Sequence, residues 1–176
     1  LVVFAEHLIF TFLAMTIMIV ISIIKTEILV KISIPLFAIS FIFLALVPII
    51  GVEVKGAKRW IDLYFFRLQP IEILKPFFIL MTVKILTFER FKNSQIKYIL
   101  SFLILGSVII LLIDQPDLGQ SILLIGSWLA TVFISGVSVV YMFIFLSIFL
   151  ICLSSLLFFL PEKFGYIFNR LITFFD

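Results

Sequence analysis

The sequence predicts an all-α protein that crosses a membrane several times. Of its 176 residues, 64% are hydrophobic and only 13% are charged, whereas a soluble domain is nearer half apolar and a quarter charged. Six apolar segments reach or approach the length of about 20 residues that a membrane-spanning helix needs. Lipid cannot satisfy the backbone of an open strand, and these segments show no alternating pattern, so we expect each to be a helix.

The six predicted spans follow one another in a single transmembrane domain that covers residues 1–176. We expect them at residues 4–24, 32–52, 71–88, 98–113, 121–137 and 139–160. The connections hold most of the polar residues and are expected to be loops, at residues 25–31, 53–70, 89–97 and 114–120, with a tight turn at Ser138 and a polar tail at 161–176. Because the chain starts at Leu1 without methionine, we expect it to be a piece of a longer protein.

Charge excludes one class of partner but does not orient the chain. The net charge is +3, yet the basic residues are scattered between apolar segments and form no face that could follow the phosphates of a nucleic acid. They also divide almost evenly between the two sides of the predicted membrane, so the positive-inside rule does not decide which side is cytoplasmic. Cys152 is the only cysteine, which excludes an intrachain disulfide and a cysteine-rich metal site.

The loop between the second and third spans concentrates charge around a glycine and a tryptophan. One interpretation is interfacial anchoring, with Trp60 at headgroup depth and the basic side chains reaching lipid phosphates. The other is that Lys55, Lys58 and Arg59 bind an anionic headgroup while Gly56 permits a tight turn. Composition alone favours anchoring.

The third span opens with a polar helix start. Pro70 suits the first helical turn, where its missing N–H is not needed, and Glu72 then lies near the positive end of the helix. Glu72 and Lys75 are three residues apart and share one helical face. Because an isolated charge is costly in a membrane, we expect these two side chains to form an ion pair that faces the helix bundle or a water-filled cavity.

A second polar helix start precedes the fifth span. Gln115 and Pro116 are followed by Asp117, and the simplest interpretation is that the Asp117 carboxylate caps free backbone donors of the next helix. Since both polar starts fall on the same predicted side of the membrane, a polar cavity at that side becomes more plausible than either start alone would make it.

Three of these segments together resemble the SEDS family (shape, elongation, division and sporulation proteins). The family pattern is a Gly-Ala-x-Arg-Trp loop, a Gln-Pro-Ser-Glu-x-x-Lys span start and a Gln-Pro-Asp-x-Gly span start. The matching segments are Gly56-Ala57-Lys58-Arg59-Trp60, Gln69-Pro70-Ile71-Glu72-Ile73-Leu74-Lys75 and Gln115-Pro116-Asp117-Leu118-Gly119. Two positions depart from the family: Ile71 replaces a usual serine, and the Tyr64-Phe65-Phe66 segment replaces a common glycine.

The resemblance implies a family fold of about ten membrane spans, of which this chain would supply the second to seventh. It implies polymerisation of lipid II into peptidoglycan glycan strands, and the motifs are closer to the division protein FtsW than to the elongation protein RodA. The family's catalytic aspartate falls in a large loop beyond Asp176, so no catalytic residue and no metal ligand is assigned here. The expected substrate-cavity residues are Lys55, Lys58, Arg59, Trp60, Gln69, Glu72, Lys75, Gln115 and Asp117.

The implied setting is a bacterial cytoplasmic membrane, with the segments 53–70, 114–120 and 161–176 outside it. The expected partners are lipid II, membrane lipid, a class B penicillin-binding transpeptidase and other division proteins. No cofactor is expected, and a need for a divalent metal is left open. Two other classes of function stay open: a lipid-linked precursor flippase or transporter, which also places polar residues at broken membrane helices, and a structural division scaffold.

Overall fold

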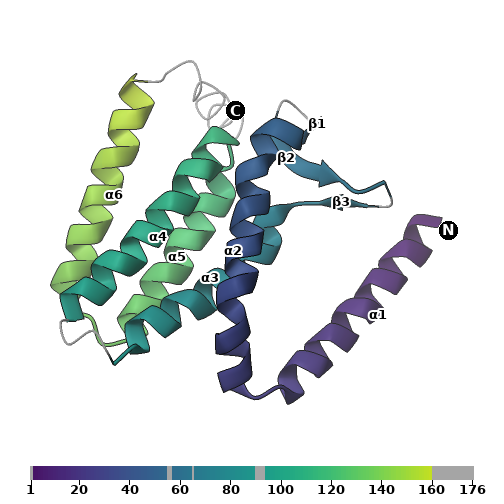
Figure 1. Cartoon of the computed structure of the whole chain (residues 1–176). Helices are drawn as coiled ribbons and strands as arrows, with labels where there is room; N and C mark the ends of the chain where they lie inside the picture. The colour runs from purple at the N-terminus through teal and green to yellow at the C-terminus, as the bar shows by residue number, and fades with distance from the viewer. Residues whose placement is uncertain (1, 55–56, 65, 90–93, 160–176) are drawn as a thin grey trace.

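The computed structural model describes residues 2–54, 57–64, 66–89 and 94–159. In this part of the chain the elements are α1 (Val2–Ile23), α2 (Thr26–Ile50), β1 (Val52–Val54), β2 (Ala57–Asp62), β3 (Arg67–Leu68), α3 (Pro70–Thr87), α4 (Ser94–Asp114), α5 (Leu118–Ile134) and α6 (Val139–Phe159). A mainly helical fold, with one helix for each predicted apolar segment, is therefore confirmed (Figure 1).

The helices begin and end close to the predicted limits but extend into polar sequence. α2 begins at Thr26 rather than at residue 32, and so includes Glu27 and Lys31. These residues are good helix formers, and a helix does not have to stop where the apolar segment does. α5 ends at Ile134, earlier than predicted, and Gly136 follows with a φ of 84°, a left-handed conformation that glycine adopts without steric cost.

Helices α2 to α5 pack around one apolar core. Its fully buried members include Leu44 on α2, Leu74 and Phe78 on α3, Leu112 on α4 and Leu124 on α5. Each of the four helices therefore contributes at least one fully buried side chain to the core, and this shared core holds the four helices together.

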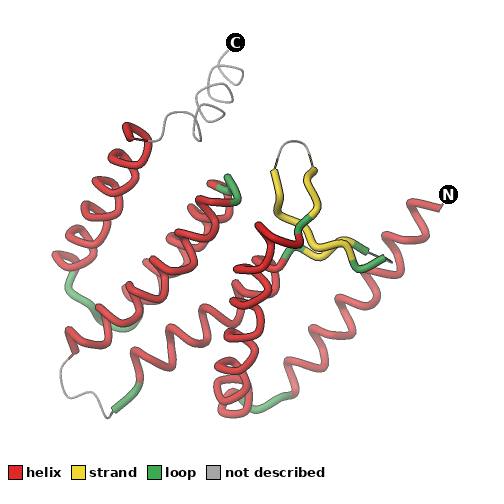
Figure 2. The backbone as a smooth tube through the Cα atoms, turned by 45° about the horizontal axis from the view of Figure 1, so that its top comes forward, coloured by secondary structure: helices red, strands yellow, loops and turns green. Residues whose placement is uncertain are grey.

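The two outermost helices are much less buried. Figures 1 and 2 both show α1 standing away from the other helices, and its described side chains, from Leu8 to Ile23, are all exposed. α6 lies beside α4 and contacts the core through Phe145, whose ring is 5.0 Å from that of Phe102 and 5.5 Å from that of Trp128, measured between centroids. Such broad exposure of apolar side chains is typical of a surface that contacts lipid or another protein.

The segment predicted as a loop between α2 and α3 contains a small antiparallel sheet in the order β1-β2-β3. Glu53 pairs with Lys58 between β1 and β2, and Asp62 pairs with Arg67 between β2 and β3, so opposite charges face each other across both ladders. The sheet joins the end of α2 to the start of α3, and we call this end of the bundle the sheet end (Figure 2).

Within the described part of the chain, two helical segments are long and apolar enough to cross a membrane by length and composition, namely Thr26–Ile50 and Gln95–Asp114. Three shorter apolar stretches, Leu8–Ile23, Leu118–Ile134 and Val139–Cys152, lie in α1, α5 and α6.

Candidate functional site

Arg59 connects the sheet to the turn between α4 and α5. Its Nε donates to the backbone carbonyl of Gln115 at 3.2 Å, and Nη2 donates to the carbonyl of Pro116. Its Nη1 also lies 3.8 Å from a carboxylate oxygen of Asp117. A planar guanidinium can meet three acceptors at once, which a lysine ammonium cannot do with the same geometry. Arg59 therefore holds the three residues of this turn in place.

Asp117 supplies the carboxylate that pairs with Arg59, and it is nearly buried, with 6% of its surface exposed. It precedes α5 as the N-cap residue, but its side chain makes no capping hydrogen bond. The carboxylate instead accepts from Gln69 Nε2 at 3.1 Å and pairs with Arg59. The predicted capping role of the carboxylate is therefore wrong, because a cation and an amide from other elements compete successfully for the same oxygens.

Gln115 satisfies a backbone group that a proline leaves free. Pro48 lies inside α2 and has no N–H to donate to the carbonyl four residues earlier, which belongs to Leu44. Gln115 is 3% exposed, and its Nε2 donates to that carbonyl at 2.9 Å. A buried carbonyl without a partner would be costly, so Gln115 and Pro48 act as a matched pair that joins the α4–α5 turn to α2.

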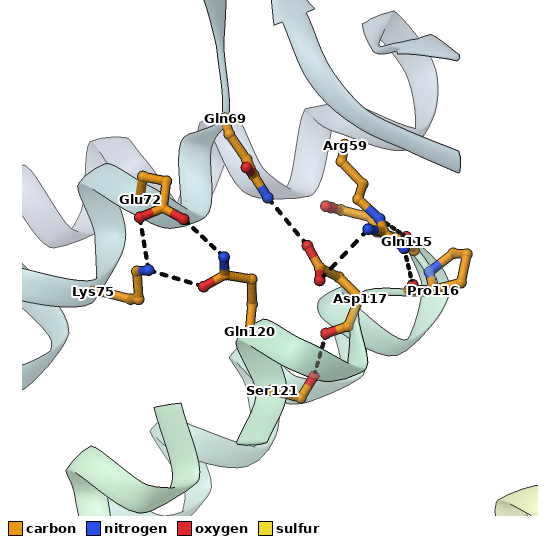
Figure 3. A network of polar contacts seen from close by, with 9 residues as sticks. All are labelled: Arg59, Gln69, Glu72, Lys75, Gln115, Pro116, Asp117, Gln120 and Ser121. Carbon is orange, nitrogen blue, oxygen red and sulfur yellow. Dashed lines mark hydrogen bonds and ion pairs between the residues drawn. The ribbon is translucent and has the colours of Figure 1, made fainter. Parts of the chain in front are cut away.

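The predicted ion pair between Glu72 and Lys75 is confirmed, with Lys75 Nζ 2.6 Å from Glu72 Oε2. Gln120 of α5 completes a triangle with these two residues (Figure 3). Its Oε1 accepts from Lys75 Nζ at 2.9 Å, and its Nε2 donates to Glu72 Oε1 at 2.7 Å. The ion pair thus faces the bundle and is tied to α5.

The nine predicted site residues are therefore not all in one place. Figure 3 shows two neighbouring clusters at the sheet end, which together hold Arg59, Gln69, Glu72, Lys75, Gln115 and Asp117. Lys58 is exposed and lines an open pocket of about 240 Å³ together with Glu53 and Asp114, and this pocket adjoins the first cluster at Gln115 and Pro116. Trp60 is half-buried in the sheet opposite Val52 and takes no part in either cluster, and Lys55 lies outside the described residues.

Sequence reasoning missed two contributors, Gln120 and Ser121. Ser121 Oγ donates to the Asp117 backbone carbonyl at 2.9 Å, which links the first turn of α5 to its N-cap residue. Gln120 follows Asp117 by three residues, and side chains at that spacing share a helical face. That spacing was the available signal for placing Gln120 beside the site.

The polar side chains of the two clusters bond to one another or to the backbone, so the arrangement can hold the helices and the sheet in place. It also leaves a few charged groups exposed at the sheet end. Glu72 keeps half of its side-chain surface exposed, while that of Asp117 is 8% exposed. Among the described residues, no group of three or more histidine, cysteine, aspartate or glutamate side chains could hold a metal ion.

Comparisons with known proteins identify the family. A family model described as "Cell cycle protein", which covers FtsW, RodA and SpoVE, matches residues 1–176. The chain is 32% identical over 133 residues to a protein of Aliivibrio salmonicida named "Probable peptidoglycan glycosyltransferase FtsW", and the match covers 74% of this chain and 33% of that protein.

Two solved structures share the fold. The rod shape determining protein RodA of Thermus thermophilus matches with a TM-score of 0.63 and 28% identity, over 72% of this chain and 42% of that one. A structure described as "Structural coordination of polymerization and crosslinking by a peptidoglycan synthase complex" matches with a TM-score of 0.69 and 26% identity, over 88% of this chain and 45% of that one.

The chain spans about a third of the length of the curated relative and less than half of either solved structure. The family model nevertheless matches from the first residue to the last, and the motif residues meet at the sheet end. The chain belongs to the SEDS family of FtsW, RodA and SpoVE proteins.

Proposed function

We propose that the full-length protein is a membrane-embedded peptidoglycan glycosyltransferase that polymerises lipid II into glycan strands during cell division, as FtsW-like proteins do. The observation that carries this proposal is the meeting of the family's three motif segments in one pair of clusters at the sheet end. Motif residues that were scattered over separate loops without contact would support family membership but not a shared substrate site.

The proposed setting is the cytoplasmic membrane, with all six helices spanning it and the sheet end on the outer side. Exposed apolar side chains along α1 and α6 are suited to contact with lipid, where they would carry no hydration cost. The charged side chains of the clusters fall at helix ends, where polar groups can reach water or headgroups. In this orientation the sheet end would face the side of the membrane on which a lipid-linked sugar substrate is polymerised.

The site residues would have different tasks. Arg59, Gln69, Gln115 and Asp117 would hold the α4–α5 turn against the sheet, since their polar groups are engaged with one another or with the backbone. Lys58 is exposed beside an open pocket, and it would attract the anionic pyrophosphate of the substrate, together with Lys55 and with Trp60 at headgroup depth.

Glu72 and Lys75 would face the substrate at the sheet end as a partly exposed ion pair. The chemical step is assigned to an aspartate of the large loop that follows residue 176 in the family. The proposal needs no cofactor, and it leaves open whether a divalent cation accompanies the pyrophosphate.

A transpeptidase of the class B penicillin-binding type is the proposed partner. Support comes from the matching structure that is described as a complex coordinating polymerisation and crosslinking. The second candidate function is the RodA-like role in cell elongation, which is favoured by the fold match to the Thermus thermophilus RodA structure.

The test is polymerisation by the purified full-length protein in vesicles that contain fluorescent lipid II. We expect labelled glycan chains on a gel, and none from the 176-residue chain alone. Lys58→Ala should raise the lipid II concentration needed for half-maximal rate, whereas Lys25→Ala, which removes an exposed cation before α2 at the opposite end, should not. Movement of intact lipid II across the bilayer without glycan synthesis would instead support a flippase.

A further inference from the structure

Gln120 is placed between the two members of the Glu72–Lys75 ion pair but comes from a different helix. Its two hydrogen bonds run in opposite senses, one accepted from the ammonium and one donated to the carboxylate. An ammonium can only donate and an ionised carboxylate can only accept, so the two partners fix which way the amide is turned.

Few side chains could occupy this position and satisfy both partners. A carboxylate offers only acceptors, so it would bind Lys75 but oppose Glu72, and an alkyl chain would satisfy neither. A primary amide offers one of each on a rigid plane, at 2.9 Å from Lys75 Nζ and 2.7 Å from Glu72 Oε1. The neutral charge of the amide also leaves the ion pair balanced, with one cation and one anion.

We propose that Gln120 is a positioning residue that aims the Glu72 carboxylate and the Lys75 ammonium at the sheet end of the bundle. It ties α5 to the charged face of α3, so the pair cannot turn toward lipid or water without breaking two hydrogen bonds. This rests on the proposed function, because the pair matters for activity only if the sheet end receives the substrate.

The charged groups near position 120 predict a distinctive response to pH. They are Glu72 and Lys75 on α3, and Asp117 before α5, whose carboxylate is already engaged by Arg59 of β2 and by Gln69. In the Gln120→Glu variant two carboxylates would share the single Lys75 ammonium. At lower pH the introduced carboxylate gains a proton, because a second negative charge beside Glu72 disfavours its ionised form, and a protonated carboxyl again offers one donor and one acceptor, as the amide does.

The experiment compares Gln120→Glu with the wild-type full-length protein in lipid II vesicles between about pH 5.5 and pH 8. Relative to wild type at the same pH, glycan synthesis by this variant should be reduced about fivefold at the upper end and less than about twofold at the lower end. Gln120→Met removes both hydrogen bonds without adding charge, and its loss should not change with pH. Gln95→Glu adds the same charge at the start of α4 and should follow wild type throughout.

Thermal unfolding of the same samples separates failure of this proposal from failure of the proposed function. The unfolding temperature of Gln120→Glu should also approach the wild-type value as the pH falls, whether or not lipid II is the substrate. Wild type that makes no glycan would remove the proposed function, and the unfolding data would then decide the role of Gln120. A Gln120→Glu variant that is equally impaired at every pH, or not impaired at all, overturns the proposal.

Discussion

Two Gln-Pro segments look alike in the sequence, yet the structure uses them in opposite ways. Gln69-Pro70 opens α3 directly, with the proline in the first helical turn, and the Gln69 amide donates to the nearly buried side chain of Asp117, just before α5. Gln115-Pro116 lies in the turn before α5, where Gln115 is buried and its amide reaches inward to the backbone of α2. The Gln-Pro dipeptide therefore indicates a helix boundary but does not predict what its glutamine binds.

The acids that follow the two dipeptides, Glu72 and Asp117, differ in exposure. The Glu72 side chain is half exposed and is held in a triangle with Lys75 and Gln120, whereas that of Asp117 is 8% exposed and is held by Arg59 and Gln69. Glu72 and Lys75 of the first segment present charges, whereas residues 115–117 fix the architecture. Substitutions should therefore affect mainly activity in the first segment and mainly stability in the second.

The largest loss of stability is expected from Asp117→Leu. It removes the carboxylate from a nearly buried pair and leaves Arg59 and Gln69 without that acceptor, which should cost about 2–4 kcal/mol of unfolding free energy, somewhat less than a fully buried pair because Arg59 is partly exposed. Asp62→Leu is the matched control, since Asp62 forms an exposed ion pair with Arg67 and should lose only about 1 kcal/mol or less. Unfolding in detergent measures both, and equal losses would contradict the contrast.

Gln115→Leu should be the next most damaging change, at about 1–3 kcal/mol, because the buried carbonyl of Leu44 loses its donor. The cost should shrink in a Pro48→Ala background, where the restored N–H can bond to the same carbonyl. A double-mutant cycle on unfolding free energies measures this coupling. Independent, additive effects would show that Gln115 does not compensate for Pro48.

Arg59→Lys should cost about 1 kcal/mol or slightly more, since an ammonium can keep some but not all of the three contacts made by the guanidinium. We expect membrane insertion to persist while glycan synthesis by the full-length protein is reduced, because Arg59 holds the turn from which α5 starts, and Asp117 and Gln120 lie at that start. Normal glycan synthesis by this variant in vesicles would reject a role for the guanidinium.

The smallest change in stability is expected from Glu72→Gln, below about 1 kcal/mol, because partly exposed ion pairs contribute little. Its effect on glycan synthesis should exceed its effect on unfolding, in contrast to Asp117→Leu. Parallel measurements of both quantities, at equal amounts of inserted protein, test this. A large loss of stability without a separate loss of activity would assign Glu72 to the architecture instead.

The parts of this fold that depend on local pattern could be predicted. Long apolar segments located all six helices, and a spacing of three residues predicted the Glu72–Lys75 pair. The small sheet was missed because β1 and β3 have only three and two residues, too few for an alternating pattern to be recognised. β2 has six residues, but its sequence does not alternate between apolar and polar side chains.

Contacts between distant segments could not be read from spacing. Arg59 meets Gln115 across 56 positions of sequence, and neither residue type indicates the other as its partner. Without Arg59 in place, a carboxylate at a helix start is most simply interpreted as a cap, which is why the role of Asp117 was predicted wrongly. The sequence shows which residues of the loop are charged, whereas the contacts that Arg59 and Asp117 make with distant segments can be seen only in the fold.

The most direct test of the division between architecture and chemistry is glycan synthesis by the full-length Asp117→Asn variant, measured well below its unfolding temperature. The asparagine side chain keeps the size of the aspartate and can still accept from Gln69. We therefore expect a lower unfolding temperature but at least about a third of wild-type glycan synthesis, given that one polar contact outside the chemical step contributes modestly. A fully folded variant that makes no glycan would show that the Asp117 carboxylate takes part in the reaction, which would contradict its assignment to the scaffold.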